Sequence, residues 1–364
     1  MIYIVIFIVS IFFAFFAFKN IKKKRLFKFL SLIAIILPSL LAGFRDYSIG
    51  TDINIYVLPA YNDVINTNSF SAYLDLVKWL DLDILYTLFN YIVVIIFKNC
   101  NVLLFFISFT ICSLFYCGAY KYKEKISPVL TYSLFLLMYY NMSLNIIRQS
   151  ISLAIIFFSL KYLDNNKTIK FCIAVLIASL FHSTAAIALI LLLIKKISIS
   201  KNKIIYSCIY LLILVVSLLF FNNILSLLNL LHIIPDKYIL RYSISKNTTL
   251  DINLADTIIR VYVWALMLLE YPLLKKKKDN LFYVLTCLSD ILLLQIGNLV
   301  PYAYRMSLYF NIVNLIYIPY IIRVAKKYKV IFLISTVLLY FAYFVYMYLI
   351  VKNGETYPYI FINS

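Results

Sequence analysis

Arg148 and His182 are the two residues of this sequence best suited to do chemistry together. Arg148 follows Asn145 and begins an apolar run, a polar turn lies at Asp164–Lys167, and a second apolar run ends at His182. Because a helix of about 15 residues rises roughly 22 Å, both side chains reach a similar depth on the face opposite the turn. Ionisable residues are costly in such apolar helices, and they usually have a function there.

This pair combines a side chain that can bind phosphate with a side chain that can accept a proton. A guanidinium binds phosphate or pyrophosphate with two parallel hydrogen bonds. An imidazole, with an ordinary pKa of about 6.5, can take a proton from an attacking hydroxyl. We therefore predict that Arg148 and His182 are catalytic, with His182 as the general base. The structural alternatives are an arginine that extends to the lipid headgroups and a histidine held by hydrogen bonds.

Other polar residues are predicted at or near the same face. The candidates for substrate binding are Arg45, Asp46, Asp52, Tyr56, Gln149 and Arg305. Asp290 is added because a carboxylate within an apolar run is a functional candidate by default, with an arginine of this group as a possible partner. The alternative for the arginines is interfacial anchoring. Asp256 and Arg260, four residues apart, are expected to pair with each other.

The composition defines the elements that must position these residues. The chain has 364 residues, of which 64% are hydrophobic, and its mean hydropathy is +0.94. Apolar runs separated by short basic turns predict an all-α, polytopic membrane protein with about 12 transmembrane helices in a single membrane domain, residues 1–364. The net charge of +19 is explained by lysines in cytoplasmic turns, so we expect no nucleic-acid partner.

The distribution of lysine and arginine predicts the topology. The basic segment 19–28 is placed inside, and residues 44–101 and 222–255 are placed outside as loop regions. The run Ile84–Phe97 is short for a crossing and fits a helix lying in the interface, whereas a spanning run would invert every later turn. The first run, Met1–Phe18, lacks the features of a cleavable signal, and both termini are expected outside.

The sequence gives little indication of a metal site or a cofactor. The six cysteines form no C-x-x-C motif, and there are only two histidines, His182 and His232. Asp81-Leu82-Asp83 has the D-x-D form of metal-dependent glycosyltransferases, but a helix cap is the favoured interpretation. No cofactor is expected, since guanidinium groups can supply the positive charge for a pyrophosphate.

Five motifs together resemble the EpsG/Wzy family of bacterial polysaccharide polymerases, in the right order between about residues 43 and 310. They are Gly43-Phe44-Arg45-Asp46, Gly50-Thr51-Asp52 with Tyr56, Ile147-Arg148-Gln149, Phe181-His182-Ser183-x-Ala185, and Tyr304-Arg305-x-x-x-Tyr309-Phe310. The resemblance implies transfer of a growing glycan from a polyprenyl-pyrophosphate carrier to a lipid-linked repeat unit at the outer face of the inner membrane. It implies that Arg45 contacts the pyrophosphate and that Asp46 or Asp52 orients it or contacts sugar.

The partners implied are the lipid-linked oligosaccharide donor and acceptor, membrane lipids and a regulator of chain length. Three alternatives use similar residues. A flippase for lipid-linked oligosaccharide should show inverted repeats and charges spread through the bilayer, and we find neither. An O-antigen ligase shares the chemistry with a different acceptor. A membrane O-acetyltransferase needs a histidine but has less use for several arginines. The polymerase is therefore the preferred hypothesis.

Overall fold

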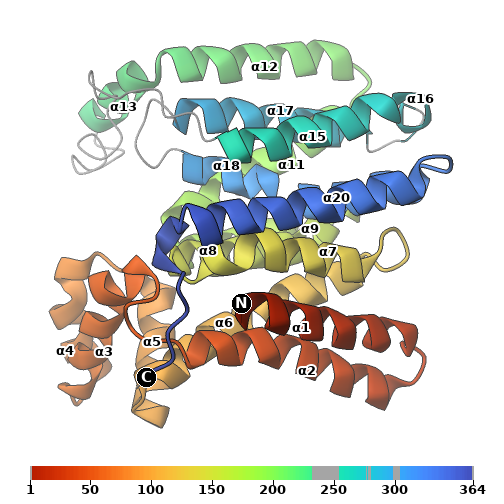
Figure 1. Ribbon diagram of the computed structural model, residues 1–364. Coiled ribbons are helices and arrows are strands. Elements are labelled where there is room, and N and C mark those ends of the chain that lie inside the picture. Colours follow the sequence, from red (N-terminus) through yellow and green to blue (C-terminus); the bar gives the residue numbers. More distant parts are fainter. Residues whose placement is uncertain (1, 232–253, 276, 278–279, 298–303, 363–364) are drawn as a thin grey trace. The chain divides into compact units, whose positions relative to one another are not determined.

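The computed structural model (Figure 1) describes the chain except residues 1, 232–253, 276, 278–279, 298–303 and 363–364. It divides into two compact units, Met1–Ala186 with Val330–Ser364 and Ile187–Lys329. Every regular element of the described residues is helical, and one isolated β-bridge joins Arg45 to Phe361. The all-α prediction is therefore confirmed. The second predicted external loop, 222–255, lies mostly outside the described residues.

The first unit contains most of the predicted site. Its helical elements are α1 Ile2–Lys19, α2 Lys24–Gly43, η1 Ile53–Val57, α3 Leu58–Ile65, α4 Phe70–Leu76, η2 Val77–Leu80, α5 Ile84–Phe97, α6 Cys100–Lys121, α7 Pro128–Phe135, η3 Leu136–Tyr140, α8 Asn141–Ser143, α9 Ile147–Asp164, α10 Thr168–Phe181, α20 Lys329–Phe344, η5 Val345–Ile350 and η6 Asn353–Glu355. A further short helix, η4 Ser183–Ala188, crosses the boundary into the second unit.

The long helices of the first unit pack in a series. Helix α1 packs on α2, α2 on α6, α6 on α9, and α9 on α10. Close approach of α6 and α9 depends on Gly118, because a Cβ there would lie 2.6 Å from the ring of Phe157. Rings fill the space beside it, with the centroids of Phe115 and Phe135 4.2 Å apart. This packing fixes α9, and with it the depth at which Arg148 lies.

The segment between α2 and α6 forms the region predicted to be external. It folds into α3, α4 and α5, which lie beyond the end of α2 in Figure 1. Helix α5 has 14 residues, as the apolar run predicts. It ends at Lys98, whose φ of 47° is left-handed, and the side chain of Asn99 then caps α6 by accepting from the amides of Asn101 and Val102.

The second unit is also helical in its described part. Its elements are α11 Leu189–Ile199, α12 Lys203–Leu219, α13 Phe221–Leu230, α15 Leu254–Leu269, α16 Tyr271–Leu274, α17 Asn280–Gly297, α18 Tyr304–Asn311 and α19 Asn314–Val324. Helix α17 packs on α18, and α15 packs on both α17 and α19. This unit contains Asp290 and Arg305.

The structure supports a helical membrane protein but not the count of about 12 spans. Five helical stretches of the described residues are long and apolar enough to cross a bilayer: Ile2–Lys19, Lys24–Gly43, Cys100–Lys121, Tyr304–Val324 and Lys329–Ile350. Other apolar runs form helices of 10–17 residues. A 14-residue helix rises about 21 Å, which is less than the roughly 30 Å of hydrocarbon. Helix length and composition therefore support five spans among the described residues, and they do not support the count of about 12.

Candidate functional site

The site is built around the first turn of α9. The first amides of a helix have no partner within it and carry partial positive charge, so a carboxylate is favoured there. Asp52 supplies that carboxylate from a distant loop, because its Oδ2 accepts from the amide of Ile147 at 3.0 Å. The hydroxyl of Tyr56 also donates to Asp52. Through this bond the Gly50-Thr51-Asp52 motif fixes the position of the first turn of α9, and therefore of Arg148.

The guanidinium of Arg148 contacts three groups from the loop region 44–101. Its Nη1 donates to Oδ2 of Asp83 at 3.0 Å and to the carbonyl of Asp81 at 3.1 Å. Its central carbon lies 4.8 Å from the ring centroid of Tyr56, a cation–π distance. The side chains of Arg148 and Asp83 are each 19% exposed, so the ion pair is accessible at its edge. A planar cation held in this way is oriented before any ligand arrives.

Asp83 joins Arg148 to the histidine motif. Its Oδ1 accepts from the amide of Ser183 at 3.2 Å, while its Oδ2 holds Arg148. Burial raises the pKa of Asp83, and the nearby charge of Arg148 partly opposes that shift. One carboxylate thus connects the first turn of α9 with the residue that follows His182. We use the name Arg148 cluster for Asp52, Tyr56, Asp83, Arg148 and His182–Thr184.

The sequence indicated Asp83 only as a helix cap or a metal ligand. The residue does stand before α5, but its side chain makes no capping bond to that helix. Among the described residues no group of three or more His, Cys, Asp or Glu side chains could hold a metal. The sequence did contain a signal for this contact. The predicted topology places Asp83, which precedes the interfacial helix, on the same side of the bilayer as Arg148.

His182 ends α10 and is half-buried. Its amide donates to the carbonyl of Ala178 at 2.9 Å, and its backbone is then extended. Its Nδ1 lies 3.4 Å from the amide nitrogen of Thr184 and 3.2 Å from the Thr184 hydroxyl. A backbone N–H can only donate, so this contact favours Nδ1 as an acceptor. The neutral ring then carries its proton on Nε2.

Helices α9 and α10 hold Arg148 and His182 at the same end of their hairpin, as the sequence predicts. The hydroxyl of Ser152, one turn after Arg148, donates to the carbonyl of Ala178 at 2.7 Å. Ala178 is the same residue that accepts from the His182 amide. The bond between Ser152 and Ala178 therefore holds Arg148 and His182 at the same level along the two helices.

Arg45 lies in the interior of the first unit. Only 2% of it is exposed, and its Nη1 donates to the carbonyl of Leu144 at 3.0 Å. Tyr3, Tyr140 and Tyr359 surround it and pack edge to face on one another, with Tyr3 5.5 Å from Tyr359 and 6.4 Å from Tyr140. The sequence predicts Arg45 at or near the outer face and did not indicate this burial, and binding of pyrophosphate by Arg45 stays a prediction. The buried position favours a role in holding the loop after α2 against the start of α9.

Asp46 is also engaged within its own loop. Its Oδ1 accepts from the amide of Ser48 at 2.9 Å and from the Ser48 hydroxyl at 2.7 Å. These bonds hold the pKa of Asp46 below its ordinary value. The arrangement is an Asx-type turn, which a serine two residues later completes. Binding of substrate by Asp46 stays a prediction.

The C-terminal segment, residues 353–362, lies along the loop that contains the first two motifs (Figure 1). The amide of Asp46 donates to Ile360, and Ile362 donates back to Phe44, both at 2.9 Å. The amide of Gly50 donates to Glu355 at 3.3 Å. Nothing in local sequence predicts these contacts, because the partners are about 300 residues apart.

Asn145 connects this C-terminal segment with the loop that contains Gly50, Thr51 and Asp52. Its Oδ1 accepts from the amide of Thr51 at 3.0 Å and also from the Thr51 hydroxyl. On its other side, a Cβ added at Gly354 would lie 3.0 Å from its Nδ2. Gly50 has φ of 91°, and a Cβ there would lie 2.4 Å from the carbonyl oxygen of Leu144. Both glycines are therefore required for this close approach.

The remaining predicted residues lie elsewhere. Gln149 follows Arg148 but is buried, with 1% exposed. In the second unit, Asp290 is 1% exposed and its Oδ1 accepts from Nε of Arg260 at 2.9 Å. The predicted pair of Arg260 with Asp256 is present at 3.4 Å. Asp290 thus has Arg260, rather than a predicted site arginine, as its partner.

Asn311 completes this buried network of the second unit by donating to the other oxygen of Asp290 at 2.6 Å. The hydroxyl of Ser307 accepts from Arg260 at 3.2 Å. Because Arg260 and Asp290 pair with each other and both make further hydrogen bonds, the network is suited to holding α15, α17 and α18 together. Arg305 lies in the first turn of α18 and is half-buried. The substrate-binding roles of Asp290 and Arg305 stay predictions.

Comparison with known proteins identifies the family. No curated protein and no solved structure is similar enough to match. The sequence matches the model of the EpsG family over residues 28–361, which is most of the chain. That match includes every motif on which the resemblance rested, and it suggests a role of the polysaccharide-polymerase type in a membrane. The chain therefore belongs to the EpsG family.

Proposed function

We propose that this protein is a polysaccharide polymerase, a glycosyltransferase of the cell's inner membrane with its site at the outer face. It would transfer a growing glycan from a polyprenyl-pyrophosphate carrier to a lipid-linked repeat unit. The observation that carries the proposal is the Arg148 cluster, in which one carboxylate holds both Arg148 and the Ser183 amide at 3.0 and 3.2 Å. Three of the family's motifs meet there in a part-exposed position.

In the proposed reaction, the bond between the anomeric carbon and the pyrophosphate oxygen breaks. The oxygen of an acceptor sugar hydroxyl forms the new glycosidic bond, and its proton ends on a phosphate oxygen of the departing pyrophosphate. The leaving pyrophosphate keeps the electron pair and gains negative charge. Arg148 would stabilise that charge, because a fixed guanidinium needs no reorganisation when the charge develops. Its position on the Tyr56 ring and against Asp83 supports this role.

His182 has two possible roles that differ in the location of one proton. With Nδ1 accepting from the Thr184 amide, Nε2 carries the proton and can donate to a phosphate or sugar oxygen. The base role predicted from sequence needs the other tautomer, in which Nδ1–H donates to the Thr184 hydroxyl. The backbone contact favours the donor role, and we propose that His182 orients the substrate through Nε2–H.

Asp83 and Asp52 act through other residues in this proposal. Asp83 sets the direction of the guanidinium and the start of η4, and Asp52 fixes the first turn of α9. Both are therefore positioning residues. Such residues matter because a displacement of about 1 Å at the reacting groups can lower a rate by about 100-fold.

The glycan pattern of a deletion strain tests the proposal. Loss of the polymerase should remove the polymer ladder and leave single repeat units on the carrier or acceptor, and wild-type protein should restore the ladder. Arg148→Ala should not restore it at equal protein level in the membrane. Polymer that persists on the carrier in the deletion strain would indicate a ligase. Repeat units that remain at the cytoplasmic face would indicate a flippase.

A further inference from the structure

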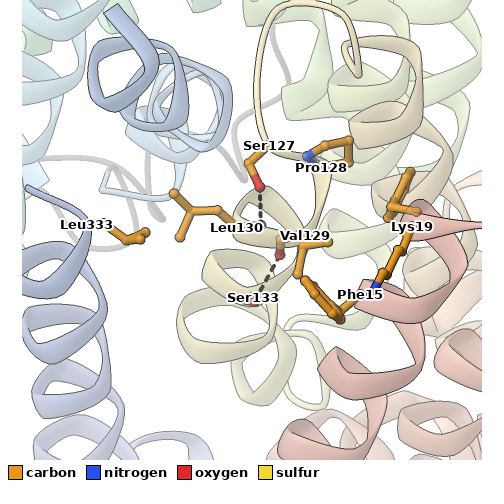
Figure 2. Close-up of a pocket in the computed structure, with 9 residues that line it drawn as sticks. Phe15, Lys19, Ser127, Pro128, Val129, Leu130, Ser133 and Leu333 are labelled. Carbon is orange, nitrogen blue, oxygen red and sulfur yellow. Dashed lines mark hydrogen bonds between the residues drawn. The ribbon is translucent and has the colours of Figure 1, made fainter. Parts of the chain in front are cut away.

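A groove of about 600 Å³ lies between α1 and α7 in the first unit, and none of the residues of the Arg148 cluster lines it (Figure 2). Phe15 and Phe18 of α1 line it, together with Val129 and Leu130 of α7 and Leu333 of α20. Its volume falls within the range of about 300–1,000 Å³ that is usual for small-molecule sites. The helical run from Pro128 to Ser143 rises about 24 Å, which separates the groove from the start of α9.

The two serine hydroxyls that line the groove already form hydrogen bonds within α7 or at its start, and the other polar side chain of the lining is a lysine. The Ser127 hydroxyl accepts from the amide of Leu130 at 3.3 Å, and the Ser133 hydroxyl donates to the carbonyl of Val129 at 2.9 Å (Figure 2). Lys19 is the one charged residue of the lining and is exposed at the last turn of α1. The groove therefore offers an apolar surface that ends in a cation.

Lys19 begins a strongly basic turn. The exposed cations that follow within ten residues are Lys22, Lys23, Lys24, Arg25 and Lys28. In the part of the chain that the structure describes, no ion pair with a carboxylate is formed by any of them or by Lys19. Cytoplasmic turns of membrane proteins carry this excess of positive charge, and the inner leaflet carries anionic lipid.

Aromatic rings mark the depth of this end of the groove. The ring centroids of Phe18 and Tyr116 lie 5.3 Å apart, as do those of Phe27 and Tyr120. Tyr116 is buried and its hydroxyl bonds to Ser31 at 2.8 Å, whereas Tyr120 is half-buried and is the ring that can reach the headgroup level. Tyrosines are concentrated at the level of the headgroups, where one end of the ring is apolar and the other polar. The lysine end of the groove thus has the features of an interface.

We propose that this groove is a binding site for an anionic phospholipid of the inner leaflet. One acyl chain lies against the phenylalanine and leucine side chains, and the phosphate lies against Lys19. Charge complementarity selects the headgroup, because a net negative headgroup gains an attraction to Lys19 that a zwitterionic headgroup largely lacks. The site would fix α1 against α7, and its existence does not depend on the reaction proposed for the Arg148 cluster.

Photocrosslinking of the purified full-length protein tests this site. The probe is phosphatidylglycerol with a diazirine in one acyl chain, and the control is phosphatidylcholine with the same chain. Phosphatidylglycerol should label the peptide that contains residues 128–133 about fivefold more strongly, the gain expected from roughly one lysine at an anionic headgroup. Lys19→Gln should reduce that label to the phosphatidylcholine level. Equal labelling by the two lipids would overturn the proposal.

Two further variants separate the groove from general surface charge. Val129→Trp should block the groove and lower labelling by both lipids, with its unfolding temperature measured to show that the protein remains folded. Lys28→Gln removes a cation of the same turn that does not line the groove, so its effect should be smaller than that of Lys19→Gln. Equal effects of the two lysine variants would show diffuse attraction only. Displacement of the probe by polyprenyl phosphate but not by unlabelled phosphatidylglycerol would identify a different occupant and overturn the proposal.

Discussion

Asp83→Asn should separate activity from stability. The two oxygens of Asp83 each accept from a different donor, Arg148 at 3.0 Å and the Ser183 amide at 3.2 Å. An asparagine has one acceptor oxygen and one amide nitrogen, so either orientation leaves one of these donors facing an N–H group. The variant must therefore release either the guanidinium or the start of the histidine motif.

The expected loss of activity follows from the charge on this bond. A hydrogen bond to a charged group contributes about 1.5–3 kcal/mol, and expression of that amount in the transition state changes a rate by roughly 10- to 150-fold. We expect polymer synthesis by Asp83→Asn to fall at least about tenfold. The assay is the intensity of the glycan ladder in a deletion strain that carries each variant, normalised to the amount of protein in the membrane.

Stability should respond differently, because burial raises the pKa of Asp83 despite the neighbouring Arg148. A carboxyl group with a raised pKa in the folded protein stabilises it at low pH, and this contribution is lost as pH rises through the folded pKa. At neutral pH the uncharged asparagine avoids the cost of burying a carboxylate. This gain in stability offsets the hydrogen bond that the substitution removes. We expect the unfolding free energy at pH 7 to change by less than about 1 kcal/mol.

The same reasoning gives a sign for the pH dependence. The unfolding temperature of Asp83→Asn minus that of wild type should be higher at about pH 7 than at about pH 4. Asp75→Asn is the matched control, because Asp75 pairs with Lys78 on the surface, where the two side chains are 67% and 76% exposed. Asp75→Asn should leave both polymer synthesis and the difference in unfolding temperature between the two pH values unchanged. Full activity in Asp83→Asn, or a loss of activity that only mirrors a loss of folded protein, would refute the reasoning.

Three other substitutions test the site. Arg148→Lys should lose most polymer, because a point charge cannot contact Tyr56 and Asp83 as the planar group does. If this variant made polymer of wild-type amount and length, anchoring to the lipid headgroups would be the only role left for Arg148. His182→Gln should stay within about tenfold of wild type while His182→Ala loses more, since an amide can replace the Nε2–H donor. A dead glutamine variant and wild-type activity that falls below about pH 6.5 would instead support the base. Gly50→Ala should lower the unfolding free energy by at least about 1 kcal/mol, measured by thermal melting, because its φ is 91° and its Cβ would meet the Leu144 carbonyl; an unchanged melting curve would contradict this turn.

Local sequence determined the helical class and the depth of the two principal residues. Apolar runs with basic turns can only satisfy their backbone groups as helices in a membrane, so the all-α prediction did not depend on tertiary detail. The turn between α9 and α10 likewise required Arg148 and His182 to return to one end, and Ser152 bonds the two helices there. The length of α5 also followed directly from its apolar run.

The number of spans could not be derived in the same way. Breaks such as the π-helical segment Leu136–Tyr140 after α7, and the ends of helices shorter than 18 residues, leave hydropathy almost unchanged. Composition counts apolar residues, whereas a crossing needs an uninterrupted rise of about 30 Å.

Only the tertiary structure decided which polar residues form the site. Arg45 and Arg148 have the same chemistry and the same predicted level, yet one is buried against the Leu144 carbonyl and the other is held at the surface by Asp83. The difference depends on partners about 65 to 100 residues away. Hydrophobic periodicity fixes the face and depth of a side chain within its own helix, but the group that it meets is set by how the helices pack.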